Sequence, residues 1–329
     1  MYFNNLNWIK IKEVIYINMK KISIISPCLN ERENLIDLTK SVKNIFEKLN
    51  YYDYEHIIAD NNSEIETKKI LRNLAIKDKK IKILFNSKNF GSQMSTFNAI
   101  KYSSGDAVFL FLPSDMQDPP SLIPKFIEKW ESGYDVVYGT RDKRQENFVL
   151  KNIRFIYYKI INKISLNSIP LNISDFQLVD KKILKEIIKI NDNSPFIRSL
   201  PISFTDNVFR ISYEFKKRKS GKSKEVFKAL INTGIKGMIF ASSAPFRLLI
   251  FFGFIISAIS ILYGMFSFVN HLFFITDVEK GIPLLLVSFF IFFGVNLFFL
   301  GFIGEYITNI YNMILNKDRV LVSEKINFD

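Results

Sequence analysis

Residues 22–31 read Ile-Ser-Ile-Ile-Ser-Pro-Cys-Leu-Asn-Glu, and this stretch begins a pattern that repeats along the first half of the chain. Its first five residues favour a β-strand, and the polar residues after Pro27 favour a turn. Leu35, Leu38 and Val42 then follow at helical spacing, which predicts a helix with one apolar face. A strand, a polar turn and an amphipathic helix in this order are typical of an α/β fold.

The same succession continues as far as residue 138. Further strands are predicted at Tyr54–Ala59, Ile81–Phe85, Ala107–Leu112 and Asp135–Tyr138. Helices are predicted between them, over about 64–76, 92–102 and 121–130. This alternation predicts a mostly parallel, Rossmann-like sheet covered by helices on both faces, with right-handed crossovers.

Polar residues follow each of the first four predicted strands. They occur at 30–31, 60–63, 86–93 and 114–118. Ligands of such sheets bind beyond the carboxyl ends of the strands, so we expect a binding site at this edge. Acidic and amide side chains there suit a ribose, a base edge and a divalent cation that bridges phosphates. The chain has no Gly-x-Gly-x-x-Gly and no Walker A motif, which argues against dinucleotide redox chemistry and NTP hydrolysis.

The composition of the chain narrows the possible classes of binding site further. The chain has 329 residues, 45 Lys+Arg against 32 Asp+Glu, and a formal net charge of +13. Cys28 is the only cysteine, which excludes an intramolecular disulfide and a cysteine-based zinc site. Residues 141–163 carry a net +5 and residues 210–236 a net +7. Because the excess charge lies in two segments, we interpret it as a footprint for a membrane surface and a lipid phosphate, not for nucleic acid.

Two long apolar runs lie in the last third of the chain. Leu248–Thr276 has 29 consecutive residues without a formal charge, and Gly281–Gly304 has 24. A bilayer core about 30 Å thick needs roughly 20 apolar residues in a helix, so a transmembrane helical hairpin is predicted. Basic residues flank the hairpin and the connector 277–280 is slightly acidic. The positive-inside rule then places the globular domain and both termini on the cytoplasmic side of the cytoplasmic membrane.

These features predict the following organisation. Residues 1–18 form an N-terminal extension, because Met19 reads like a natural start, and residues 19–222 form the globular domain. A juxtamembrane helix (223–246), two spans (247–276 and 281–304) and a cytoplasmic tail (305–329) follow. Residues 148–164 mix Ile and Tyr with Lys and Arg, which suits either a core-facing helix or a helix in the headgroup layer. A homo-oligomer remains an open alternative.

Four motifs carry a resemblance to a known family. They are Pro27-x-x-Asn30-Glu31, Asp60 at a strand end, the loop that ends in Gly91, and Asp115-x-Gln117-Asp118-Pro-Pro. Together they resemble the GT-A fold glycosyltransferases of family 2. Tyr213 with Arg218, residues 244–247 and residues 304–311 are similar to the polyprenyl-phosphate group of that family, which includes dolichyl-phosphate mannose synthase and bacterial undecaprenyl-phosphate sugar transferases. The Gln-x-x-Arg-Trp motif of processive synthases is not found.

The resemblance implies a membrane enzyme that moves a sugar from a UDP- or GDP-sugar to a polyprenyl phosphate, with inversion, assisted by Mg²⁺ or Mn²⁺. The implied donor-binding residues are Pro27, Asn30, Glu31, Asp60, Gly91 and Asp115. The implied metal ligands are Asp115 and Gln117. The implied catalytic residues are Asp175, Arg141 and Arg144. The residues implied to bind the acceptor phosphate are Arg198, Arg218, Ser223 and Lys224.

Simpler interpretations of the same residues stay open. Asp115 also suits a helix N-cap, Asp175 a turn, and Arg198 a surface ion pair. His56, inside a predicted strand, favours a packed histidine over a catalyst, and Cys28 favours a small buried thiol.

Four positions depart from the family's pattern. Pro113 replaces the first acid of an Asp-x-Asp element, Asn61 replaces a second acid, and Gln177 and Phe215 replace arginines. We interpret the set as an altered donor preference or a weaker dependence on metal. One rival hypothesis is a non-catalytic membrane scaffold or accessory protein that keeps a degenerate nucleotide-sugar fold. Another is transfer to a protein or saccharide acceptor.

Overall fold

The computed structural model describes residues 19–114, 116–143, 173–190, 196–214, 282–314 and 320–328, together with isolated positions between 255 and 269. The chain divides into two units. The first comprises Met1–Ile153, Pro170–Phe227 and Asn316–Asp329, and the second comprises Arg154–Ile169 and Lys228–Leu315. The predicted N-terminal extension lies outside the described residues.

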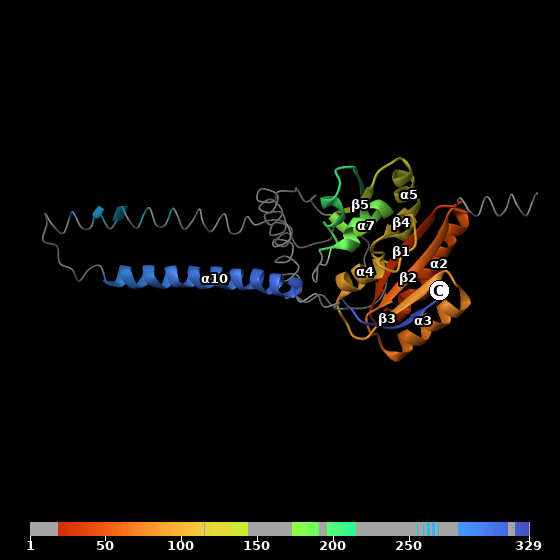
Figure 1. Ribbon diagram of the computed structural model, residues 1–329, viewed down its shortest axis with the longest axis horizontal. Coiled ribbons are helices and arrows are strands. Elements are labelled where there is room, and N and C mark those ends of the chain that lie inside the picture. The colour runs from red at the N-terminus through yellow and green to blue at the C-terminus, as the bar shows by residue number, and fades with distance from the viewer. Residues whose placement is uncertain are drawn as a thin grey trace, which may run out of the picture. The chain divides into compact units, whose positions relative to one another are not determined.

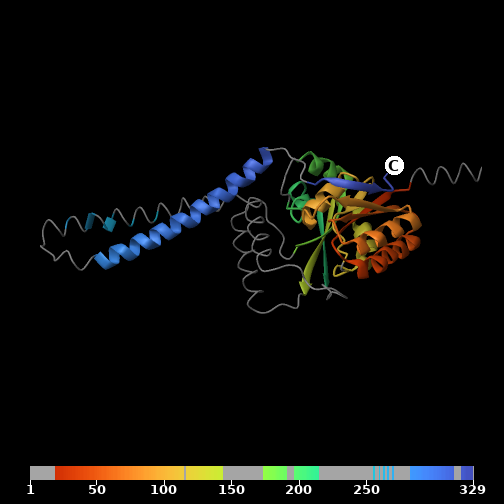
Figure 2. The ribbon, with the colours of Figure 1, turned by 90° about the horizontal axis from the view of Figure 1, so that it is seen from below.

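The first unit is built on an eight-stranded sheet with the order β7-β5-β6-β4-β1-β2-β3-β8. Figures 1 and 2 show helices on both faces of this sheet. Its described elements, in chain order, are β1 (Lys21–Cys28), α2 (Arg32–Lys48), β2 (Asp53–Asp60), α3 (Ile65–Lys77), β3 (Ile81–Asn86), α4 (Ser92–Ile100), β4 (Ala107–Phe109), η1 (Pro120–Leu122), α5 (Ile123–Glu131), β5 (Val136–Lys143), β6 (Ile173–Asp180), α7 (Lys181–Lys189), η2 (Pro201–Ser203), β7 (Val208–Glu214) and β8 (Val322–Ile326).

The prediction of an α/β fold with a mostly parallel sheet is confirmed. β1 pairs in parallel with β2 and β4, β2 with β3, and β5 with β7. β6 is antiparallel to both β4 and β5, and β8 is antiparallel to β3. The fourth strand ends at Phe109 instead of Leu112 because the backbone changes partner there: the Leu110 amide donates to Gln177 O at 2.9 Å and the Leu112 amide to Ile25 O at 2.8 Å.

Three strands, β6, β7 and β8, were not predicted from the sequence. β6 contains Asp175, so the alternative that Asp175 lies in a turn is wrong. β8 comes from the predicted tail and extends the sheet at the β3 edge. Asn327 ends that strand by donating to Ala75 O and Ile81 O, both at 2.8 Å, and Glu324 pairs with Arg72. A potentially open sheet edge is therefore covered by the chain's own C-terminal segment.

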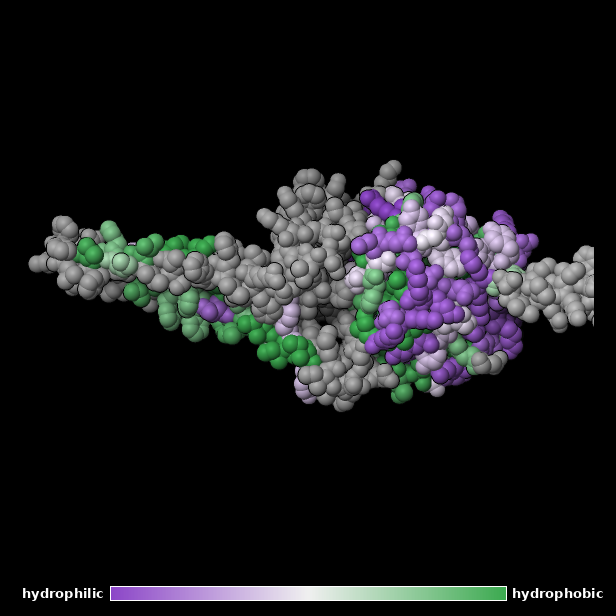
Figure 3. Space-filling model, turned by 45° about the horizontal axis from the view of Figure 1, so that its top comes forward, coloured by the Kyte–Doolittle hydropathy of each residue, from purple (hydrophilic) through white to green (hydrophobic). Residues whose placement is uncertain are grey.

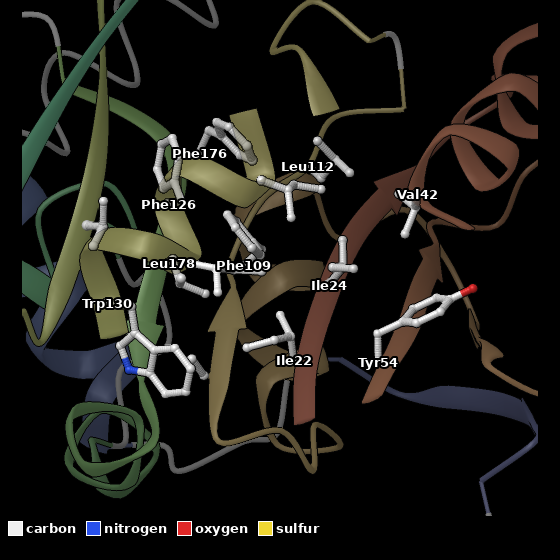
Figure 4. Close-up of a cluster of buried hydrophobic side chains, with 14 of the residues drawn as sticks. Ile22, Ile24, Val42, Tyr54, Phe109, Leu112, Phe126, Trp130, Phe176 and Leu178 are labelled. Atoms are coloured by element: carbon white, nitrogen blue, oxygen red, sulfur yellow. The ribbon is translucent and has the colours of Figure 1, made fainter. Parts of the chain in front are cut away.

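The core explains why the helices form where they do. α5 places Ile123, Phe126, Ile127 and Trp130 at intervals of three and four residues, and all four are buried. Phe126 packs on Phe176 of β6 with ring centroids 4.8 Å apart, and Figure 4 shows these rings beside the strands. An apolar helix face buried against alternate residues of a strand is the arrangement that the sequence periodicity predicts.

The second unit is described chiefly by α10 (Ile282–Ile314), a 33-residue helix. Many of its exposed side chains are large and apolar, among them Leu285, Phe289, Phe292, Leu297 and Leu300. Figure 3 shows hydrophobic surface along this helix and a largely hydrophilic surface on the visible face of the first unit. Among the residues that the structure describes, no helix is both long and apolar enough to cross a membrane. The transmembrane hairpin therefore stays a prediction.

Candidate functional site

The turns after the first two strands are bound to each other. Asn30, after β1, donates from its backbone amide to Ser63 Oγ at 2.9 Å, and its Oδ1 accepts from the Glu64 amide at 2.8 Å. The Asn61 amide donates to Cys28 O at 2.9 Å. Asn30 has a φ of 55°, a left-handed conformation that asparagine tolerates better than most residues. The predicted donor-binding turn is thus held in shape by its neighbour.

The turns after the third and fourth strands join the same edge. Ser114 Oγ donates to Pro27 O at 2.9 Å, which connects the fourth turn to the first. Asn86 Nδ2 donates to Asn61 Oδ1 at 3.1 Å and to Ser95 Oγ at 2.9 Å, which connects the third turn to the second and to α4. The structure therefore brings together the four polar segments that the sequence placed after four different strands.

Several predicted donor-binding side chains are already hydrogen-bonded within this edge. Asp60 is fully buried and accepts from the Ser63 amide at 3.1 Å. Burial raises the pKa of Asp60, and the hydrogen bonds from Ser63 oppose that rise. Glu31 accepts from Asn34 Nδ2 at 2.9 Å. Gly91 begins α4 with a φ of 83°, a conformation that favours glycine.

A buried group that we call the Asp118 cluster (Asp118, Arg141, Ser174 and Tyr213) lies beside the fourth turn. Asp118 is fully buried, and Arg141 donates to it from Nε at 3.1 Å and from Nη2 at 2.6 Å. The Tyr213 hydroxyl donates to the same carboxylate and is 3.0 Å from Ser174 Oγ. Gly139 permits this approach, because a Cβ there would lie 2.5 Å from the Tyr213 ring.

Arg141, which the resemblance predicts to face phosphates, is bonded to Asp118 in this cluster, and its role toward a phosphate stays a prediction. Burial lowers the pKa of Arg141, but Asp118 and Tyr213 outweigh it and hold that pKa above its usual range. Burial, with the Asp118 charge, also raises the pKa of Tyr213. Asp118 had no role assigned from the sequence, although it stands in the quoted Asp115-x-Gln117-Asp118 motif. Its only sequence signal was its place directly before two prolines.

A second group, the Asp175 cluster (Asp175, Gln177 and Arg198), lies on the opposite face of β6. Successive side chains of a strand point to opposite faces, so Asp175 and Gln177 share a face while Ser174 and Phe176 share the other. Arg198 donates to Asp175 from Nε at 3.2 Å and from Nη2 at 2.7 Å. The Asp175 and Arg198 side chains are 11% and 19% exposed. Arg198 therefore forms an ion pair, as that alternative held, but the pair is largely buried and does not lie at the surface.

The remaining predicted residues divide in two. Gln117 is described and half-buried. Asp115, Arg144, Arg218, Ser223 and Lys224 lie outside the described residues, as do Phe215 and all of residues 144–172. Within the described ranges, no three His, Cys, Asp or Glu side chains gather closely enough to hold a metal ion.

His56 and Cys28 are packed as the sequence favoured. His56 is buried with its Nε2 2.9 Å from Ser26 Oγ, and burial lowers its pKa to about 3. Cys28 is a buried free thiol, and burial raises its pKa to about 12. Neither residue has the exposure that a catalyst needs.

An α/β sheet whose central strands are parallel and whose polar turns gather at one edge is typical of a domain that binds a ligand at that edge. The sequence pattern described as glycosyl transferase family 2 matches residues 23–195. This chain belongs to glycosyl transferase family 2. The resemblance noted from its motifs is confirmed.

Relatives of known name extend the likeness beyond that domain. The SfII prophage-derived bactoprenol glucosyl transferase of Shigella flexneri is 32% identical over 305 residues, which cover 92% of this chain and 98% of that protein. The prophage bactoprenol glucosyl transferase homolog of Escherichia coli (strain K12) is 30% identical over 292 residues, 88% of this chain and 94% of that protein. Among solved structures, glucosyl-3-phosphoglycerate synthase from Mycobacterium tuberculosis aligns with a TM-score of 0.49 and 15% identity, covering 69% of this chain and 80% of that one.

Proposed function

We propose that this protein transfers a sugar from a nucleotide-sugar to the phosphate of a polyprenyl phosphate. The observation that carries the proposal is the identity of 32% with a bactoprenol glucosyl transferase over 92% of this chain. That span runs past the family 2 domain at residues 23–195. The names of these relatives make glucose the first sugar to test and bactoprenol the first lipid.

The Asp175 cluster supplies chemistry that fits such an acceptor. A phosphate monoester is anionic at neutral pH, so its oxygen is a nucleophile that needs little deprotonation. The forked guanidinium of Arg198, held by Asp175 at 2.7 and 3.2 Å, has the geometry that binds phosphate oxygens in pairs. One phosphate oxygen would attack the anomeric carbon while the bond to the nucleoside diphosphate breaks, and the diphosphate departs with the electron pair. A single displacement of this kind inverts the anomeric centre.

The connected turns at the sheet edge suit the donor. Asn30, Glu31, Asp60 and Gly91 lie on turns that are bonded to one another, so the edge is preorganised and loses little entropy on binding. We infer that the nucleotide lies along this edge. The carboxyl ends of parallel strands are the usual ligand position in sheets of this type.

A divalent ion, Mg²⁺ or Mn²⁺, is proposed at Asp115 and Gln117. Asp118 is committed to Arg141 and Tyr213, and Pro113 offers no side-chain ligand, so the sequence of this turn supplies one further carboxylate, Asp115, and one amide, Gln117. Mg²⁺ typically takes one or two carboxylates and completes its coordination with phosphate oxygens and water. These residues therefore fit the ion without the missing acid. When bound, the ion neutralises charge on the leaving diphosphate.

The membrane location is likewise a proposal. The charge-free runs 248–276 and 281–304 support an anchor in the cytoplasmic membrane, as do the exposed apolar side chains of α10. A polyprenyl phosphate resides in a bilayer, so an enzyme that uses it must reach the headgroup layer. The basic segments 141–163 and 210–236 would face that layer, with the globular domain and both termini in the cytoplasm.

A donor panel tests the proposal. Membranes containing the full-length protein are incubated with labelled UDP-glucose, GDP-glucose and other nucleotide-sugars, with and without undecaprenyl phosphate. We expect chloroform-soluble label that depends on the lipid phosphate and is lost in Asp115→Ala, while Asp37→Ala, an exposed acid of α2, behaves as wild type. No turnover with any donor would support the scaffold hypothesis. Turnover that ignores the lipid phosphate would support a different acceptor.

A further inference from the structure

Gln177 occupies a position where the family resemblance expects arginine, and the structure shows what its side chain does. The residue lies in β6 and is fully buried. It shares a strand face with Asp175, two residues earlier. A fully buried side chain does not contact a donor directly, so the substitution does not by itself alter the donor site.

The amide group of Gln177 binds the backbone around Arg198. Its Nε2 donates to Arg198 O at 2.7 Å and to Ser174 O at 3.0 Å. Both partners are carbonyl oxygens, which only accept, so the orientation of the amide is settled by its neighbours. The Oε1 atom has no hydrogen-bond partner among the described residues. The contribution of this side chain therefore comes from its two donated bonds.

Arg198 is consequently held at two points by one strand. It lies in the turn at 197–200, outside any helix or strand. Asp175 holds its guanidinium, and Gln177 holds its carbonyl. Asp175 and Gln177 are two residues apart on β6, so they hold the guanidinium and the backbone carbonyl of Arg198 at a set separation. The Gln177 carbonyl also accepts from the Leu110 amide at 2.9 Å, so the same residue is bonded to the segment that leads to the 113–118 turn.

We propose that Gln177 is a positioning residue for acceptor recognition: it sets the backbone of Arg198 so that the guanidinium meets the acceptor's phosphate. The inference rests on the proposed function. Arginine at this position would bring a second guanidinium into a fully buried site beside Arg198, where desolvation and like charge both oppose it. Glutamine supplies the donors without the charge.

The main test compares Gln177→Met with wild type, using full-length protein, UDP-glucose and undecaprenyl phosphate. Methionine matches the length of glutamine but donates no hydrogen bond, so two buried carbonyls lose their donor. We expect the KM for undecaprenyl phosphate to rise about tenfold, while kcat and the KM for UDP-glucose change by less than about threefold. Thr39→Val is the matched control, because Thr39 is a buried polar residue of α2 that donates to Leu35 O; its KM values should equal those of wild type.

Two further variants separate positioning from general damage. If Gln177 acts through Arg198, Gln177→Met adds nothing to the acceptor KM of Arg198→Ala, whereas independent roles give additive effects. Gln177→Glu donates only when its carboxyl is protonated, and burial raises the pKa of such an acid. The ratio of its acceptor KM to that of wild type should therefore fall as pH is lowered from 8 to 6.

Three results would overturn the inference. They are an unchanged acceptor KM in Gln177→Met, an equal rise in the KM for UDP-glucose, or additivity with Arg198→Ala. Each of these leaves the proposed function intact as long as wild type still makes glycolipid. Absence of any glycolipid from the wild-type protein across the donor panel would instead remove the proposed function, and this inference with it.

Discussion

A carboxylate–guanidinium pair lies at each face of β6, through Ser174 on one side and Asp175 on the other, and the two pairs differ in their surroundings. Asp118–Arg141 is sealed, with side chains 0% and 14% exposed, and Tyr213 completes the bonding of Asp118. Asp175–Arg198 is more open, at 11% and 19%, and its arginine belongs to a turn. The sealed pair ties the fourth turn to β5 and β7. We propose that the open pair meets a ligand.

The degree of burial decides whether a carboxylate–guanidinium pair serves mainly to stabilise the fold or can bind a ligand. Withdrawing two charges from water costs several kcal/mol per ion, and the mutual attraction repays that cost only when geometry and further hydrogen bonds are good. The Asp118 cluster satisfies this with three donors on one carboxylate. A ligand would have to displace them all. The Asp175–Arg198 pair is less completely buried, and we propose that an incoming phosphate reaches it.

Removing one partner of the sealed pair should have the largest effect. Asp118→Ala leaves the buried Arg141 charge uncompensated, which typically costs 3–5 kcal/mol. We expect that loss in the free energy of unfolding, measured by chemical denaturation of the full-length protein in detergent, with Asp37→Ala as the control. A loss below about 1 kcal/mol would show that the cluster does not stabilise the domain.

Removing the negative charge of the open pair should lower activity strongly and change stability little, whereas at the sealed pair the main loss is in stability. Asp175→Asn keeps the shape of the side chain but removes its charge. We expect kcat to fall about 100-fold, the loss that a misplacement of about 1 Å can cause, while the free energy of unfolding changes by less than about 1.5 kcal/mol. Initial rates and denaturation curves are measured on the same preparation. An activity loss that merely follows the stability loss would abolish the distinction between the two pairs.

Tyr213→Phe sharpens the comparison within the sealed cluster. The change removes the hydroxyl that donates to Asp118 and leaves the ring that packs on Phe176. A buried hydrogen bond to a charged group contributes about 1.5–3 kcal/mol, so unfolding should become easier by about that amount. The initial rate of glycolipid formation should stay within about threefold of wild type. A collapse of the rate with unchanged stability would place Tyr213 in the chemistry instead.

His56 shows what burial does without a charged partner. Its pKa is lowered to about 3, so between pH 6.5 and 3 the unfolded chain binds a proton that the folded chain does not. Stability contributed by this site therefore falls as pH is lowered, by up to about 1.4 kcal/mol per pH unit. Burial raises the pKa of Glu55, but hydrogen bonds from Ser104, Ser23 and Lys82 hold that pKa at about 2. The stability that Glu55 contributes is therefore lost only below about pH 4.5.

Between pH 6.5 and 4.5 Glu55 adds no slope, and the raised pKa of Asp60 affects both proteins of a matched pair alike, so a variant at position 56 reports on the histidine. Denaturation of wild type and of the double variant Ser26→Ala/His56→Leu at several pH values in this window is the measurement. The double variant should show a flatter dependence of the free energy of unfolding on pH. Equal slopes would mean that His56 is solvated in the folded protein.

The sequence predicted the parts of this fold whose signals are local. β1 to β5 and the helices between them follow from apolar periodicity, and the polar strand ends predicted a shared edge. β6, β7 and β8 were missed because their pairing is long-range. β8 has the polar sequence Val-Ser-Glu-Lys-Ile, and it becomes a strand only because the chain returns to β3 after α10.

The candidate site likewise has residues that the sequence selected and contacts that only the structure shows. Asp175 and Arg198 were selected as functional residues, but 23 positions separate them and nothing local indicates that they form one pair. Gln177 looked like a departure from a motif, and its hydrogen bonds to backbone carbonyls could be seen only in three dimensions. Asp118 was quoted within a motif without a role, because its partners lie on β5 and β7.

The most direct test of this account is transfer of label from UDP-[¹⁴C]glucose to undecaprenyl phosphate by the full-length protein. The account predicts chloroform-soluble glucolipid that requires the lipid phosphate, is nearly absent in Asp175→Asn, and is unchanged in Thr39→Val. Equal label in Asp175→Asn, or release of label to water at the same rate without lipid phosphate, would contradict it.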